Sequence, residues 1–118
     1  MKSLFTVLSS VALALVLAGC ATGQPKPESL LAQAQSRVEQ ARSVNAERHA
    51  PVVFREAQKN LKMANELISK EEYEKATSYL DRSIADSNLA IATSNAEKSE
   101  KAAQQVQKNL RALEREVK

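Results

Sequence analysis

Apolar residues recur at steps of three and four positions along most of this chain, which is the spacing of an amphipathic α-helix. The first apolar stripe consists of Leu31, Ala34, Val38 and Ala41. The second consists of Phe54, Ala57, Leu61, Ala64, Leu67 and Ile68. Pro51 lies between them, and proline disfavours a helical residue before it but suits the first turn of a helix. The pattern therefore predicts helices over about 29–48 and 51–68.

The remaining sequence, residues 70–118, contains neither glycine nor proline and predicts one long helix. One apolar stripe crosses its first half and consists of Tyr73, Ala76, Leu80, Ile84 and Ile91. A second stripe, here called the heptad seam, alternates steps of four and three for more than four heptads. It consists of Ala85, Leu89, Ala92, Ala96, Ser99, Ala103, Val106, Leu110, Leu113 and Val117. Such a pattern is typical of a coiled coil.

The connection between the second and third helices is predicted by Ser69-Lys70-Glu71-Glu72, which has the spacing of a capping box. Ser69 would be the N-cap and Glu72 the reciprocal partner, with a tight turn at about 68–71. We therefore expect an all-α fold. It would be an antiparallel helical hairpin or three-helix arrangement with a long C-terminal, coiled-coil-like helix.

The lengths of these helices predict an uncovered end. A helix over 51–68 is roughly 27 Å long and one over 70–118 roughly 73 Å, so the shorter helices cover the long one only to about residue 90. The seam from Ala96 to Val117 is then an interaction surface. We expect either parallel self-association or docking on another protein, because an isolated apolar stripe is frayed or paired.

Composition supports the helical assignment and excludes other classes. The chain has 118 residues, and its two glycines, Gly19 and Gly23, both lie near the N-terminus. β-Sandwiches, barrels and phosphate-binding loops need turn residues and glycines that are missing here. Without Lys2, the remaining 16 basic and 14 acidic side chains leave a formal charge of +2. No basic block or interleaved aromatic residues favour nucleic-acid binding.

The N-terminus has the features of an export signal. Lys2 precedes an uncharged apolar run over 4–19, which is short for a membrane-spanning helix. The run ends in Leu17-Ala18-Gly19-Cys20, which resembles the lipobox of bacterial lipoproteins. The resemblance implies that 1–19 is a signal peptide, cleaved between Gly19 and Cys20. It also implies that Cys20 carries thioether-linked diacylglycerol and an amide-linked acyl chain. The alternatives are an ordinary signal peptide followed by a free thiol or by an intermolecular disulfide.

Residues 20–28 would be the lipidated cysteine and a spacer, and residues 29–118 the helical domain. Ala21, rather than aspartate, follows Cys20. By resemblance to enterobacterial lipoproteins, this implies sorting to the periplasmic leaflet of the outer membrane. The anchor would be stable, because two or more chains hold a protein at a bilayer. Lipidation uses the only cysteine, so we expect no metal site and no cofactor beyond the covalent lipid.

A family resemblance covers about residues 30–100. The residues that carry it are Ala41-Arg42, Ala50-Pro51, Phe54, Ala57, Leu61, Ala64, Glu72-Tyr73-Glu74-Lys75-Ala76, Ser83-Ile84-Ala85-Asp86 and Leu89-Ala90. They resemble an uncharacterised domain family of bacterial envelope lipoproteins, the domain of unknown function 4398. Members of that family typically have a Gly-Asp-type turn before the tyrosine, where this chain has Lys70-Glu71-Glu72. The resemblance implies no catalytic residues.

The chain offers little for catalysis, and we expect a protein that is not an enzyme. His49 is the only histidine, and we expect it to be a solvated side chain at a helix C-terminus. The terminal Lys118 follows a helical rod, an outline that resembles the murein lipoprotein and implies a possible attachment to peptidoglycan. Against this, Glu114-Arg115-Glu116-Val117 departs from the aromatic, basic end of that protein.

Two functions follow from these features. The first is an outer-membrane-anchored periplasmic lipoprotein with a structural, scaffolding or interaction role, as a homo-oligomer or with an envelope partner. The second is a tetratricopeptide-like module that binds a peptide or peptidoglycan. That module would be a monomer with a concave face near Phe54, Tyr73 and Leu80.

Overall fold

A computed structural model describes residues 23–118, so the predicted signal peptide, its predicted cleavage site and Cys20 lie outside the described residues. Within residues 23–118 all regular structure is helical. The helices are α2 (Glu28–Ser43), α3 (Ala46–His49), α4 (Pro51–Ser69) and α5 (Tyr73–Val117). The predicted all-α fold with one long C-terminal helix is therefore confirmed.

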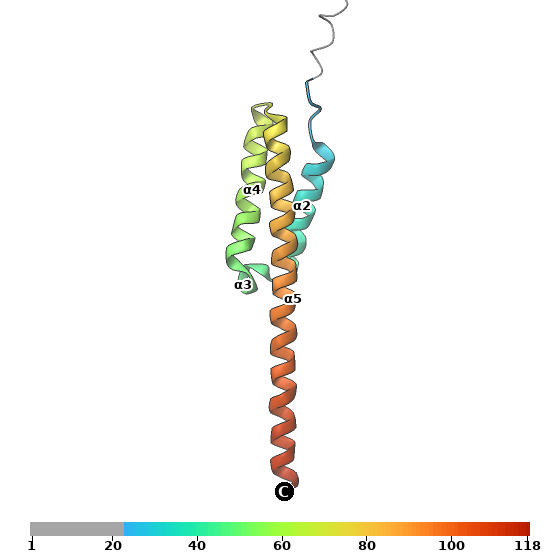
Figure 1. Ribbon diagram of the computed structural model, residues 1–118, viewed down its shortest axis with the longest axis vertical. Helices are drawn as coiled ribbons and strands as arrows, with labels where there is room; N and C mark the ends of the chain where they lie inside the picture. The colour runs from blue at the N-terminus through green and yellow to red at the C-terminus, as the bar shows by residue number, and fades with distance from the viewer. Residues whose placement is uncertain (1–22) are drawn as a thin grey trace, which may run out of the picture.

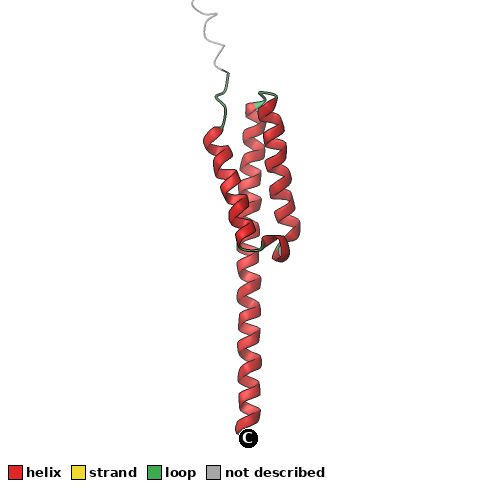
Figure 2. Cartoon of the chain, turned by 180° about the vertical axis from the view of Figure 1, so that it is seen from behind, coloured by secondary structure: helices red, strands yellow, loops and turns green. Residues whose placement is uncertain are grey.

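The helices α2 and α4 lie along the first half of α5, and no other described helix lies beside its second half (Figure 1). Helix α4 is antiparallel to α5, whereas α2 runs in the same direction as α5, and each packs mainly against α5. The short α3 crosses between α2 and α4 at the lower end of this bundle. At 45 residues α5 is about 67 Å long, against about 28 Å for the 19 residues of α4. The predicted three-helix arrangement with a projecting end is confirmed (Figure 2).

The core depends on small side chains and one phenylalanine. Phe54 of α4 is fully buried among Val38, Ala41, Ala46, Ala50, Ala57 and Ala90. A second cluster joins Ala34, Ala64 and Leu80. Alanine and serine let helices approach closely, because their side chains occupy little of the space between two backbones.

The buried face of α5 differs from the predicted one. The buried residues are Ala76, Leu80, Ser83, Ser87, Ala90 and Ser94, so half of this face is serine. Ala76 and Leu80 of the apolar stripe predicted over the first half of this helix are buried, whereas Tyr73, Ile84 and Ile91 of that stripe are partly buried, with Ile84 and Ile91 packed against the core clusters. The stripe did not include the three serines, because it was read from apolar character alone, whereas close packing of α2 and α4 requires small residues.

The helix predicted over 29–48 is two helices. Helix α2 ends at Ser43, and Asn45 adopts the left-handed conformation with φ 58°. Asparagine tolerates this conformation better than most residues, so the chain can bend here without glycine. The four residues of α3 form a single helical turn, and Ala46 is fully buried. Helix α4 then begins at Pro51, as predicted.

The turn between α4 and α5 is also not the predicted capping box. Ser69 is the last residue of α4, and its Oγ donates a hydrogen bond to the carbonyl oxygen of Asn65 at 3.0 Å. Instead, the N–H groups of Glu71 and Glu72 donate to the carbonyl oxygens of Ile68 (3.0 Å) and Leu67 (2.9 Å). With Glu71 at φ 59°, this is a Schellman motif in which glutamate occupies the usual glycine position. The end of α4, rather than the start of α5, therefore determines the turn.

The described helices differ from membrane-spanning helices. Within residues 23–118, none combines the length and the apolar character that crossing a membrane requires.

Candidate interaction surface

The heptad seam is exposed along its whole length, including the part that lies beside α2 and α4. All ten of its residues are exposed. Its large members are more than half exposed: Leu89 (54%), Val106 (57%), Leu110 (55%), Leu113 (57%) and Val117 (86%). Val52 is the other large apolar side chain with comparable exposure in residues 23–118. The exposed apolar surface of the described chain is thus concentrated on one line of α5.

The seam lies on the side of α5 opposite the bundle. Ser83 and Ser87 face α2 and α4, and the seam residues Ala85 and Leu89 follow them by two positions. Two residues correspond to about 200° around an α-helix. The sequence predicted that only the projecting end would lack a partner, but this geometry leaves the covered half of the seam open as well.

The bundle ends where the inner face of α5 becomes charged. Continuing the heptad spacing of the buried residues beyond Ser94 leads to Glu97 and Lys101. These positions offer no apolar surface to a packing helix, and every residue from Ser99 to Lys118 is exposed. The seam on the opposite face remains apolar to Val117, so it extends beyond the end of the buried face.

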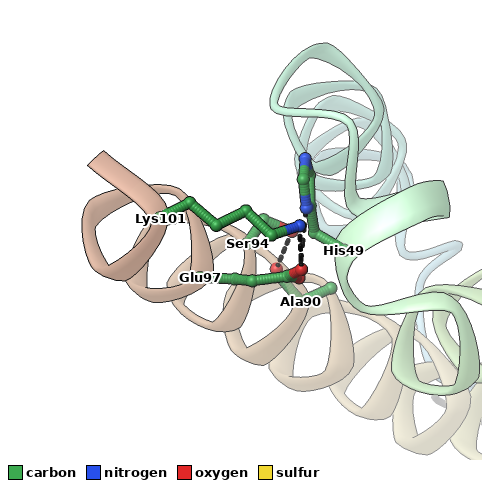
Figure 3. A network of polar contacts seen from close by, with 5 residues as sticks. All are labelled: His49, Ala90, Ser94, Glu97 and Lys101. Atoms are coloured by element: carbon green, nitrogen blue, oxygen red, sulfur yellow. Dashed lines mark hydrogen bonds and ion pairs between the residues drawn. The ribbon is translucent and has the colours of Figure 1, made fainter. Parts of the chain in front are cut away.

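A polar network closes the lower end of the bundle (Figure 3). His49 Nδ1 lies 3.1 Å from Glu97 Oε2, and Lys101 Nζ lies 2.6 Å from Glu97 Oε1. The hydrogen bond from Lys101, together with that of His49, lowers the pKa of Glu97. The side chain of His49 is only 12% exposed, so the expectation of a solvated histidine was wrong. The one-turn α3 directs His49 toward α5, which the sequence did not predict.

The concave face expected near Phe54, Tyr73 and Leu80 is not open. Phe54 and Leu80 are fully buried by the chain's own helices, because α2 packs against α5 next to α4. An open groove of about 490 Å³ lies instead between α2 and α4. It is lined by Val38, Glu39, Arg42, Gln58, Leu61, Lys62, Asn65, Glu66 and Ser69. The groove combines acidic and basic side chains with the half-buried Leu61, so its chemistry suits a ligand that has both polar and apolar groups.

The other chemistry in the described residues is limited. Residues 23–118 contain no group of three or more histidine, cysteine, aspartate or glutamate side chains placed to hold a metal ion. Lys118 is exposed at the end of α5, at the opposite end of the molecule from the spacer that enters α2 (Figure 1). The structure therefore presents two features suited to binding, the heptad seam and the groove, and the seam is the longer of the two.

The fold and this surface define a class: a small helical rod whose longest helix carries an open coiled-coil seam. The chain belongs to the family described as domain of unknown function (DUF4398), whose match covers residues 29–106. The matched region includes the bundle and the seam as far as Val106. No curated protein and no solved structure matches the chain significantly.

Proposed function

We propose that this protein is a lipoprotein anchored in the periplasmic leaflet of the outer membrane, where it acts as a structural or scaffolding protein of the cell envelope. The observation that carries the proposal is the position of the seam relative to the N-terminus. The spacer enters α2 at one end of the bundle, and α5 projects from the other end with its seam exposed. A chain held by its N-terminus would present the seam away from the membrane.

The anchor is supported by the sequence. An uncharged apolar run ends in Leu17-Ala18-Gly19-Cys20, and a spacer whose residues 23–26 are exposed leads into α2. A lipid-bearing Cys20 would need no membrane-spanning helix, because two or three acyl chains suffice for stable binding. Assembly through α5 would then occur in the periplasm, at a distance from the bilayer set by the length of the rod.

Fatty-acid labelling in cells tests the anchor. The full-length chain should incorporate the label and sediment with outer membranes. A Cys20→Ala variant should lose the label and leave the membrane fraction or accumulate as uncleaved precursor. Ala21→Asp is the matched control for sorting, and in an enterobacterial host it should keep the label but move to the inner membrane. A wild-type chain that is exported without label would refute the anchor.

The groove between α2 and α4 supports a second candidate, a module that binds a peptide or peptidoglycan. Lys62 and Arg42 on its walls could contact carboxylates of such a ligand, beside the apolar Leu61. Co-sedimentation of the full-length protein with isolated sacculi tests this candidate. Lys62→Glu should abolish sedimentation, whereas Arg55→Glu, an exposed change on α4 outside the groove, should not. Equal sedimentation of the two variants would exclude the groove.

A further inference from the structure

We propose that the heptad seam binds the same seam of a second copy of this chain, forming a parallel, in-register two-stranded coiled coil from Ala85 to Val117. The parallel direction rests in part on the proposed lipid anchor, since two copies anchored in one leaflet have their α5 helices pointing the same way. The pairing itself rests on the residues of α5.

The regularity of the seam requires a long helical partner. Its alternating steps of four and three continue without interruption for about 48 Å of helix. A globular groove that takes a helix needs only anchors at i, i+3 or i+4, and i+7, over about two turns. A strict repeat of 3.5 residues along this distance matches a partner with the same repeat. A second copy of α5 has that repeat and that length.

The bundle does not obstruct such a partner. Helices α2 and α4 occupy the serine-rich face of α5, about 200° from the seam. In a two-fold pair, the α2 and α4 helices of each copy therefore lie on the outside. Contact can begin at Ala85, beside the bundle, and continue to Val117 at the tip.

The side chains suit a close pair of helices. Positions a of the heptads are Leu89, Ala96, Ala103, Leu110 and Val117, and positions d are Ala85, Ala92, Ser99, Val106 and Leu113. The small residues in the middle allow the two backbones to approach closely, and the last four a and d positions, from Val106 to Val117, all have large residues. Burial of these large residues supplies the hydrophobic stabilisation that the exposed end of α5 lacks within one chain.

The polar residues that flank the projecting part of the seam favour the parallel arrangement. In a parallel in-register pair, Asn95 lies opposite Glu100 of the second copy, and Asn109 opposite Glu114 of the second copy. These pairs can form hydrogen bonds from amide to carboxylate. An antiparallel pair that buries the whole seam instead places Glu100 opposite Glu100 and Asp86 opposite Glu114. Like charges in such positions repel, so the antiparallel alignment is disfavoured.

Cysteine crosslinking of the full-length protein in isolated outer membranes tests the pairing. Val106→Cys at a d position should form a disulfide with its counterpart, and oxidation should convert most of the chain to doubled mass. Lys108→Cys, at an exposed position facing away from the seam, is the matched control. Because a disulfide needs Cα atoms within about 7 Å, we expect Val106→Cys to give at least about tenfold more dimer than Lys108→Cys.

Further variants separate the alternatives. Adding Leu110→Glu and Leu113→Glu to Val106→Cys should reduce the dimer at least about tenfold, since burying unpaired charges opposes pairing. Monomeric Val106→Cys would overturn the proposal. So would a disulfide that forms only in the double variant Ala96→Cys, Val106→Cys, which indicates antiparallel pairing, or a crosslink to a different protein. Dimers of the wild-type chain would instead reveal a free Cys20 thiol, which refutes the lipid anchor without bearing on the seam.

Discussion

The buried hydroxyl of Ser83 on α5 donates a hydrogen bond to the carbonyl oxygen of Ala57 on α4, with an Oγ–O distance of 2.8 Å. Both residues are fully buried. The contact shows how a polar side chain can belong to a helix interface: serine is small enough for the backbones to approach, and its hydroxyl is satisfied by the neighbouring helix.

Replacement of Ser83 should separate these two contributions. Ser83→Ala removes one buried hydrogen bond and should lower the free energy of unfolding by about 1 kcal/mol. Ser83→Leu should cost more, about 2–3 kcal/mol, because the larger side chain forces α4 and α5 apart. Urea unfolding followed by circular dichroism measures both. Ser78→Ala, an exposed change on the same helix, should leave the midpoint unchanged. If Ser83→Ala and Ser83→Leu lowered the free energy of unfolding equally, the close approach of α4 to α5 at Ser83 would be contradicted.

Phe54 is the largest fully buried side chain of the described residues, and its loss should be severe. Phe54→Ala leaves a cavity between α2, α4 and α5 and should lower the free energy of unfolding by about 3–5 kcal/mol. That is a large share of the total stability of a small domain. Val52→Ala on the exposed side of α4 is the control, and thermal unfolding compares the two. A shift in melting temperature for Phe54→Ala no larger than for Val52→Ala would show that Phe54 is not in the core.

Glu71 occupies a left-handed position that glycine adopts without steric cost. Glu71→Gly should therefore raise the free energy of unfolding by about 0.5–1 kcal/mol, since the relief of strain exceeds the entropy that glycine adds to the unfolded chain. Asn45→Gly should have a smaller effect, because asparagine already tolerates φ near 58°. A destabilised Glu71→Gly variant would contradict the assigned turn.

The network at Glu97 predicts a pH dependence of stability. The hydrogen bonds from Lys101 and His49 lower the pKa of Glu97 in the folded chain below its ordinary value of 4.5. A lowered folded-state pKa contributes stability above pH 4.5, and this contribution disappears as the pH falls through the folded-state value. Glu97→Gln should thus reduce stability near neutral pH and lose less stability on acidification than the wild type.

Urea midpoints measured at neutral pH and below about pH 4 test this prediction as the difference between variant and wild type. Glu66→Gln, an exposed change on α4, is the matched control and should follow the wild type. If the urea midpoint of Glu97→Gln changes with pH in the same way as that of the wild type across the acid range, the network does not contribute to stability.

Much of the fold could be predicted from local rules. Pro51 begins a helix because its missing N–H is not needed in the first turn, and the glycine-free stretch after it forms one long helix. The all-α fold, the position of the turn before Tyr73 and the uncovered end of α5 follow from spacing and length alone. The break at Asn45 could not be predicted in the same way, because no proline or glycine marks it. The bend at Asn45 is stabilised by tertiary contacts, because it brings Ala46 and His49 against α5.

The amino-acid sequence by itself determined the helical class, the heptad seam and the length of α5, since each depends on the order of residues along one helix. Only the tertiary structure decided which face of α5 is buried. Two apolar stripes with similar spacing were available, and spacing alone did not decide between them. The bundle buries Ala76 and Leu80 of one stripe together with Ser83, Ser87 and Ser94, because close packing of three helices requires small side chains. The apolar seam on the opposite face consequently stays open.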